Sequence, residues 1–64
     1  MEANNPSSDL AHIAEEVRAA CLRAAQQGYE RAATDGLCTE GAWEVALDAI
    51  RSLDIKSLLR ELKP

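Results

Sequence analysis

The chain of 64 residues has no phenylalanine, one tryptophan and one tyrosine, so it offers few large side chains to fill a core. A domain of this length buries only about 60% of the surface that its unfolded chain exposes. Small domains usually gain further stability from disulfides, a metal ion or self-association. Because two cysteines form at most one bridge, a disulfide framework is excluded.

The chain also lacks the residue patterns of metal sites and of common catalytic sites. Two cysteines and one histidine, without CxxC or HxxxH spacing, fall short of the four ligands of a structural zinc site. Glycine-rich phosphate loops, GxSxG and HExxH are absent. The neighbouring acids Glu15 and Glu16 would point in different directions on a helix, which indicates a solvated face rather than an acid/base pair. We therefore expect neither an enzyme acting alone nor a cofactor or metal.

Long apolar runs are missing as well. No run approaches the roughly 18 residues that a membrane span needs. The first ten residues, MEANNPSSDL, lack the basic and apolar regions of a secretory signal. These features predict a cytoplasmic protein, in a reducing compartment, without a membrane partner.

The charge is acidic and unevenly distributed, with a net value of −4. Residues 1–50 carry three arginines against nine acidic residues, a net −6, and residues 51–64 carry four basic against two acidic residues, a net +2. Such a chain lacks the basic footprint that binds phosphates, so we expect no nucleic-acid partner. The opposite charges of the two segments could favour antiparallel or head-to-tail association. The more common alternative is that these charged residues form ordinary solvated faces.

A long first helix is predicted after a disordered tail at residues 1–7, in a single helical domain over residues 8–64. Ser7 or Ser8 offers an N-cap hydroxyl, and Asp9 suits the first turn. Apolar residues then follow at helical spacing: Leu10, Ile13, Val17, Ala20 and Ala24. This helix is expected to end near Thr34.

A stripe of small residues runs along the same helix. Its members are Cys21, Ala25, Gly28 and Ala32, at steps of 4, 3 and 4, and it would allow another backbone to approach closely. Gly28 either breaks the helix or stays within it at a cost of about 1 kcal/mol relative to alanine. We expect a continuous helix, because helix-compatible residues follow the glycine immediately.

The segment TDGLCTEGAW is interpreted as a turn between helices. Gly36 suits the left-handed conformation that commonly follows a helix. With Thr39 as N-cap, Cys38 and Trp43 take the spacing of a hydrophobic staple. The alternative is a reactive thiol at Cys38, because a helix N-terminus can activate cysteine.

Several features disfavour the reactive thiol. The acids Asp35 and Glu40 lie close by, and no lysine or arginine is adjacent. His12 would lie about 33 Å away along a straight helix. A bridge between Cys21 and Cys38 would require a bend near Gly28. We therefore favour the staple.

The second helix is expected from Thr39, with Trp43, Ala46, Leu47 and Ile50 on one face. Trp43 would be either a core anchor between helices or an interface hot spot. The apolar spacing breaks after Leu53, and Asp54 is a plausible cap for a short third helix. The apolar side of that helix would consist of Ile55, Leu58, Leu59 and Leu62.

The predicted fold is all-α: a helical hairpin with a long first helix, a second helix and a short third helix, which completes a bundle by dimerisation. We expect a small non-catalytic interaction, oligomerisation or accessory module whose partner is itself or another protein. The alternatives are a redox-responsive regulator using Cys38 and a small subunit of a larger enzyme. The candidate interaction residues are Cys21, Ala25, Gly28, Ala32, Trp43, Leu47, Ile50, Leu58 and Leu62. We identify no family motif in these residues.

Overall fold

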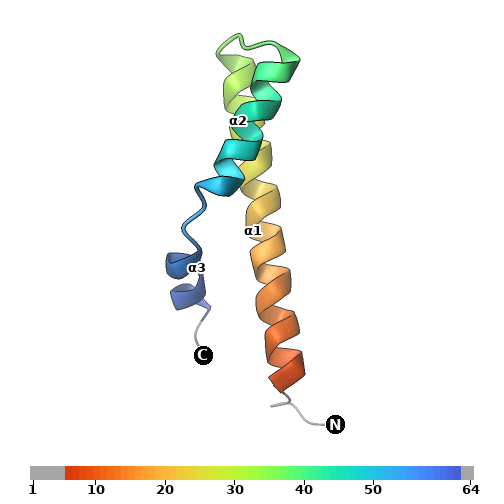
Figure 1. Ribbon diagram of the computed structural model, residues 1–64, viewed down its shortest axis with the longest axis vertical. Coiled ribbons are helices and arrows are strands. Elements are labelled where there is room, and N and C mark those ends of the chain that lie inside the picture. Colours follow the sequence, from red (N-terminus) through yellow and green to blue (C-terminus); the bar gives the residue numbers. More distant parts are fainter. Residues whose placement is uncertain (1–5, 63–64) are drawn as a thin grey trace.

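The computed structural model describes residues 6–62, and its secondary structure over this range consists of three helices. They are α1 (Pro6–Thr34), α2 (Thr39–Arg51) and α3 (Ile55–Glu61) (Figure 1). No strand occurs within this range, so the prediction of an all-α chain with three helices is confirmed. None of these helices is both long enough and apolar enough to cross a membrane.

Helix α1 begins slightly earlier than the sequence predicted. It includes Pro6 and Ser7, whereas the tail was expected to extend through residue 7. Proline fits the first helical turn because its missing N–H would have no partner there and its backbone angle is already helical. The remainder of the predicted tail, residues 1–5, lies outside the described residues.

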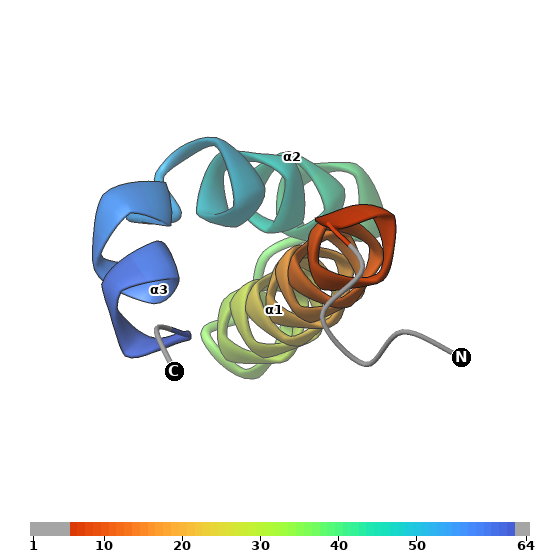
Figure 2. The same cartoon turned by 90° about the horizontal axis from the view of Figure 1, so that it is seen from below.

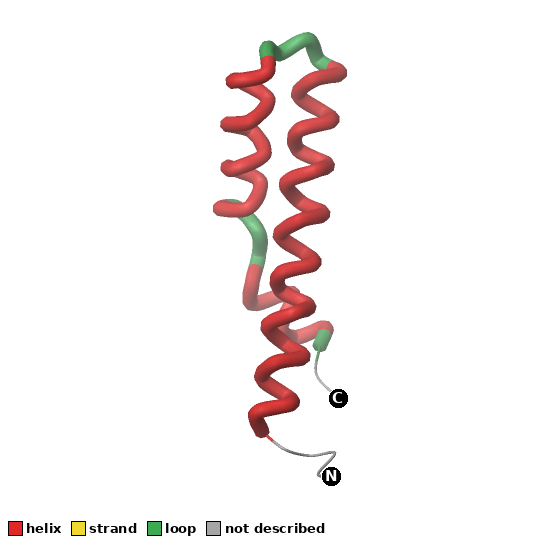
Figure 3. The backbone as a smooth tube through the Cα atoms, turned by 90° about the vertical axis from the view of Figure 1, so that its right-hand side faces the viewer, coloured by secondary structure: helices red, strands yellow, loops and turns green. Residues whose placement is uncertain are grey.

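Helix α1 continues through Gly28, as predicted, and its 29 residues extend about 43 Å. Helix α2 runs back beside the C-terminal half of α1 (Figures 1 and 3). The 13 residues of α2 extend only about 20 Å. Leu10, in the predicted apolar stripe, is 66% exposed because α2 ends before reaching that level.

A left-handed glycine forms the turn between α1 and α2. Gly36 has φ 95°, and its N–H donates to the Ala33 carbonyl at 3.0 Å. The Leu37 N–H donates to the Ala32 carbonyl, also at 3.0 Å. These two bonds form a Schellman motif, which satisfies carbonyls at the end of α1. The predicted role of Gly36 is therefore confirmed.

The N-cap of α2 is Cys38 rather than the predicted Thr39. The Ala42 N–H donates to the Cys38 carbonyl at 2.8 Å, which makes Cys38 the residue that accepts the first helical bond. This shift of one residue removes the predicted staple between Cys38 and Trp43. Leu37 takes the preceding position instead, where its side chain lies over Gly41, 3.4 Å from a Cβ placed on that glycine.

The contact between α1 and α2 consists of very small residues. Over residues 9–62, whose side chains are described, the buried apolar residues are Ala32, Ala42 and Ala46, together with Ala20, which lies on the flank of α1 that faces α3. Gly28 is also buried, and a Cβ placed on it would lie 3.1 Å from the Cβ of Ala49 and 3.3 Å from the carbonyl oxygen of Val45. The two backbones can therefore lie close together.

The face of α2 that meets α1 differs from the predicted one. Trp43, Ala46, Leu47 and Ile50 were predicted to share the inner face of α2. Of these four residues, only Ala46 is buried. Trp43 is 57% exposed, so its interpretation as an anchor between the helices of a single chain is wrong. The physical reason is the close approach at Gly28, which leaves no room for a large side chain between the helices.

Helix α3 packs sparingly against one flank of the hairpin (Figure 2). The predicted N-cap Asp54 is confirmed: its carboxylate accepts a hydrogen bond from the Ser57 N–H at 3.0 Å. The chain is elongated, measuring 50 × 20 × 14 Å with a radius of gyration of 15.2 Å. A compact chain of this length would have a radius of gyration of about 11 Å.

Candidate interaction surface

A shallow apolar groove lies between α1 and α2. It encloses about 270 Å³ and is lined by Ala25, Gln26, Tyr29, Glu30, Trp43 and Ala46. Leu22 lies seven residues before Tyr29 on α1, and Leu47 lies four residues after Trp43 on α2, so helical periodicity places both on the same side. We call the apolar residues of this side the Trp43 surface: Leu22, Ala25, Tyr29, Trp43, Ala46, Leu47 and Ile50.

Helix rotation explains why the large residues of α2 lie on this flank. Successive residues on an α-helix are 100° apart, so Trp43 is turned away from its buried neighbour Ala42. The same holds for Leu47 beside the buried Ala46. Trp43 and Leu22 are consequently 57% and 60% exposed. Large apolar side chains gathered on one exposed side are typical of an interaction site.

Carboxylates lie close to the aromatic residues of the Trp43 surface. Glu30 lines the groove itself, and Glu44 follows Trp43 directly in α2. Both side chains are exposed. The two ion pairs of the described residues lie elsewhere: Arg18 with Glu15 at 3.4 Å, and Arg51 with Asp48 at 2.6 Å. Both pairs are largely solvent-exposed and contribute little to stability.

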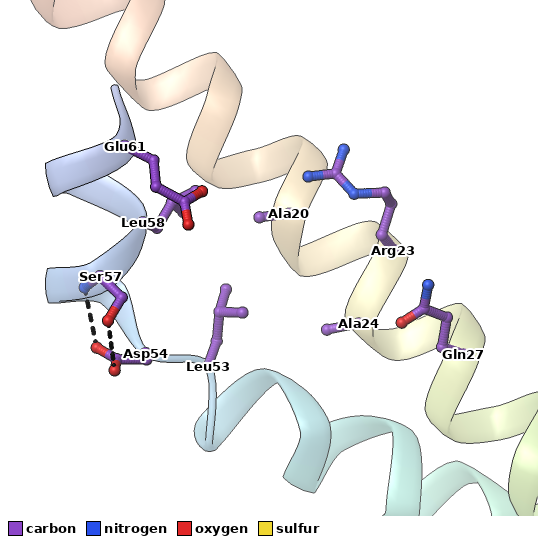
Figure 4. Close-up of a pocket in the computed structure, with 9 residues that line it drawn as sticks. All are labelled: Ala20, Arg23, Ala24, Gln27, Leu53, Asp54, Ser57, Leu58 and Glu61. Carbon is purple, nitrogen blue, oxygen red and sulfur yellow. Dashed lines mark hydrogen bonds between the residues drawn. The ribbon is translucent and has the colours of Figure 1, made fainter. Parts of the chain in front are cut away.

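A second opening, of about 310 Å³, separates α3 from α1 (Figure 4). The side chains of Leu53 and Leu58 point into it, toward Ala20 and Ala24 of α1. The opening also has polar and charged residues along its edges: Arg23, Gln27, Asp54, Ser57 and Glu61. We call this opening the α3 cleft.

The one acid in the α3 cleft with a shifted pKa has a structural explanation. Asp54 accepts hydrogen bonds from the Ser57 N–H at 3.0 Å and from the Ser57 hydroxyl at 2.8 Å. These bonds lower the pKa of Asp54, because they stabilise its carboxylate. Asp54 is therefore committed to capping α3, and its shift does not indicate catalysis.

The structure separates the candidate interaction residues into three groups. Gly28 and Ala32 are buried beneath α2, so their close-approach role is fulfilled within the hairpin. The groove or its flank holds Ala25, Trp43, Leu47 and Ile50. The remaining candidates, Cys21, Leu58 and Leu62, are half-buried elsewhere. A role for any of these residues in binding a partner stays a prediction.

The two cysteines are not joined. Both thiols are free, with Cys38 exposed and Cys21 half-buried. Cys21 lies 13 residues before the end of the continuous α1, about 20 Å along its axis. A disulfide requires Cα atoms within about 7 Å, so a bridge within the chain would require α1 to bend. Among the residues described, no group of three histidine, cysteine or acidic residues is placed to hold a metal ion.

Sequence reasoning missed Leu22 and Tyr29 as members of this surface. Their spacing of seven residues is helical and was a usable signal. Ala25, which lies between them, belongs both to the small-residue stripe and to this surface. Comparison of the chain with protein-family models, with curated proteins and with solved structures finds no match.

Proposed function

We propose that this chain is a small non-catalytic association module, which completes a helical bundle by pairing with a second copy of itself. The observation that supports the proposal is that the chain buries small apolar residues and exposes large ones. The buried apolar residues of the described chain are alanines, whereas Leu10, Leu22 and Trp43 are more than half exposed. Exposed apolar side chains on this scale are typical of an interaction site.

The layered architecture of domains supports the same proposal. Folded domains usually consist of at least two packed layers of secondary structure around a core. The hairpin of α1 and α2 is one layer, and the short α3 covers part of one flank. A second hairpin would supply the missing layer, as in four-helix bundles. We expect this assembly in the cytoplasm, with both thiols reduced.

Light scattering after size exclusion, at several concentrations with and without reductant, tests the proposal. We expect a dimer whose mass is insensitive to reductant. A folded monomer at every concentration would contradict self-association and favour an accessory subunit that needs another protein. Loss of the dimer on reduction would instead favour the redox-responsive regulator, for which the exposure of Cys38 provides access.

A further inference from the structure

We propose that the Trp43 surface is the contact between two copies, which pair antiparallel about a two-fold axis passing near Leu22. In this arrangement, Trp43 of each copy lies against the N-terminal half of the other copy's α1. The inference rests on the proposed function and adds to it the surface, the orientation and the residue nearest the axis.

The choice of surface follows from the two flanks of the hairpin. The α1 residues that line the α3 cleft are Ala20, Arg23, Ala24 and Gln27, and those that line the groove are Ala25, Gln26, Tyr29 and Glu30. No residue is common to both sets. Helix α3 therefore occupies one flank (Figure 2), and the other flank, which carries Trp43, has no covering helix from residues 6–62.

The exposed area fits a dimer of ordinary size. The chain exposes 5144 Å², whereas a compact monomer of 6.9 kDa exposes about 4,000 Å². The exposed area exceeds that of a compact monomer by about 1,100 Å². This excess is an upper bound, because the exposed area of the chain includes residues outside the described range. A stable interface commonly buries about 800 Å² per partner. One further copy is therefore sufficient to account for the excess.

The unequal helix lengths favour an antiparallel orientation. Helix α2 covers about 20 Å of the 43 Å of α1, which leaves the N-terminal half without it. An antiparallel partner would place its own α2 beside that half, and the two-fold axis makes the arrangement reciprocal. Leu22 lies near the middle of α1 (Pro6–Thr34), so it would lie close to the two-fold axis. Ala11 lies on the same side of α1, and its small side chain leaves room for Trp43 of the other copy.

Charge favours the same orientation. The end of the hairpin around the turn, residues 29–48, carries five acidic residues and one arginine, a net −4. Residues 9–28 of α1 carry three acidic residues and two arginines, a net −1. Parallel pairing would put two strongly acidic ends side by side, and antiparallel pairing separates them. It also brings Arg18 toward Trp43 and Glu44, where cation–π and ionic contacts can form.

Disulfide trapping tests the orientation in the full chain. One variant combines Leu22→Cys with Cys21→Ser and Cys38→Ser, and the matched control carries Cys21→Ser alone, which leaves Cys38 as its thiol. We expect mild oxidation to link the Leu22→Cys variant efficiently and the control poorly, because the two Cys38 residues would lie at opposite ends. Efficient linkage of the control would overturn the antiparallel arrangement.

A second pair of variants tests the surface without cysteine chemistry. Trp43→Ala should weaken dimerisation by at least about 30-fold, the effect of a hot-spot residue. Leu59→Ala removes a 40% exposed leucine from α3 and should leave dimerisation unchanged. Circular dichroism verifies that both variants fold. Equal effects of the two variants would overturn the Trp43 surface as the contact.

The outcomes distinguish this inference from the proposed function. A wild-type dimer that resists trapping at Leu22 and tolerates Trp43→Ala would overturn the inference, while the association module would stand. A wild-type chain that stays monomeric at all concentrations would overturn both.

Discussion

Helix α1 makes two contacts that differ in the size of the residues between the helices. Against α2 it presents Gly28 and Ala32, and the backbones lie close enough to bury alanines almost completely. On its other flank it faces Leu58 of α3 and Leu53 of the preceding connection, yet an opening of about 310 Å³ remains. The larger side chains hold their helix farther away and stay half-exposed.

This difference shows that close approach and apolar area are separate contributions to stability. Alanine carries one methyl group, so its burial releases little hydrophobic free energy compared with that of a leucine. The contact with α2 gains mainly from short-range packing between the helices. The large residues that would contribute most area lie outside this contact, and association with a second copy can bury them.

The largest effect is expected from Gly28→Leu, which would destroy the close contact. A Cβ at this position already lies 3.1 Å from the Ala49 Cβ, so a full leucine side chain must force α2 away. We expect a loss of at least about 3 kcal/mol, the upper range for overpacking. Thermal unfolding at fixed protein concentration measures it. Gln27→Leu, at the exposed neighbouring residue, is the control, and equal losses would contradict the role of the close contact.

The next largest effect concerns the turn. Gly36 has φ 95°, and nothing lies within 4 Å of a Cβ placed there. Gly36→Ala should therefore destabilise the hairpin through backbone conformation alone, by about 1–2 kcal/mol. Gly36→Asn should lose less, because asparagine tolerates this conformation better. Urea unfolding of the wild type, Gly36→Ala and Gly36→Asn measures these differences in stability. Equal stability of Gly36→Ala and wild type would show that the turn can adopt another conformation.

A small gain is expected at the glycine of α2. A Cβ at Gly41 would meet the Leu37 side chain at 3.4–3.6 Å, an ordinary contact distance. Gly41→Ala should stabilise the hairpin by about 0.5 kcal/mol, since alanine favours helix more than glycine does. The midpoint of urea unfolding is the measurement. Destabilisation instead would show that the turn has no room for the added methyl group.

The smallest effect should be confined to α3. Asp54→Ala removes the cap, so amide protons of α3 should exchange faster while those of α1 and α2 keep their rates. Asp54→Asn keeps an acceptor and should restore part of the protection. Faster exchange throughout the chain would contradict the weak coupling of α3 to the hairpin.

The cap also predicts a pH dependence. Hydrogen bonds from Ser57 lower the pKa of Asp54 in the folded chain. The stabilisation is therefore complete above the unfolded value, about 3.9, and is lost as the pH falls through the lower folded value. Protection of α3 amides should decrease only in this acidic range. The Asp54→Asn variant should not show this decrease.

Local signals allowed the helices to be predicted from sequence. Gly36 predicted the end of α1, and Asp54 predicted the start of α3, because turn and cap chemistry depend on neighbouring residues. The N-cap of α2 was assigned one residue too late, since Thr39 is the better capping side chain although Cys38 occupies the position. The N-cap is defined by the backbone hydrogen bond from the Ala42 N–H to the Cys38 carbonyl, and side-chain type does not predict such a bond.

The buried face of α2 was not predictable in the same way. Hydrophobicity favoured Trp43, Leu47 and Ile50 as the inner face, and α2 taken alone is consistent with that choice. The surface of α1 determines which face of α2 is buried, because Gly28 allows α2 to approach so closely that only small side chains fit between the helices. Steric fit between two helices depends on both sequences at once, so a single periodic pattern cannot reveal it.

The short turn at residues 35–38 has a consequence for the order of folding events. Closing so short a connection takes well under a microsecond, and helical domains with local contacts fold in microseconds to milliseconds. Two proteins at micromolar concentration, with a typical association rate constant of about 10⁶ M⁻¹s⁻¹, meet on a timescale of about a second. Each chain should therefore complete its hairpin long before it encounters another. The proposed pairing of two copies would then follow as a slow final phase of refolding, with a rate that increases with protein concentration.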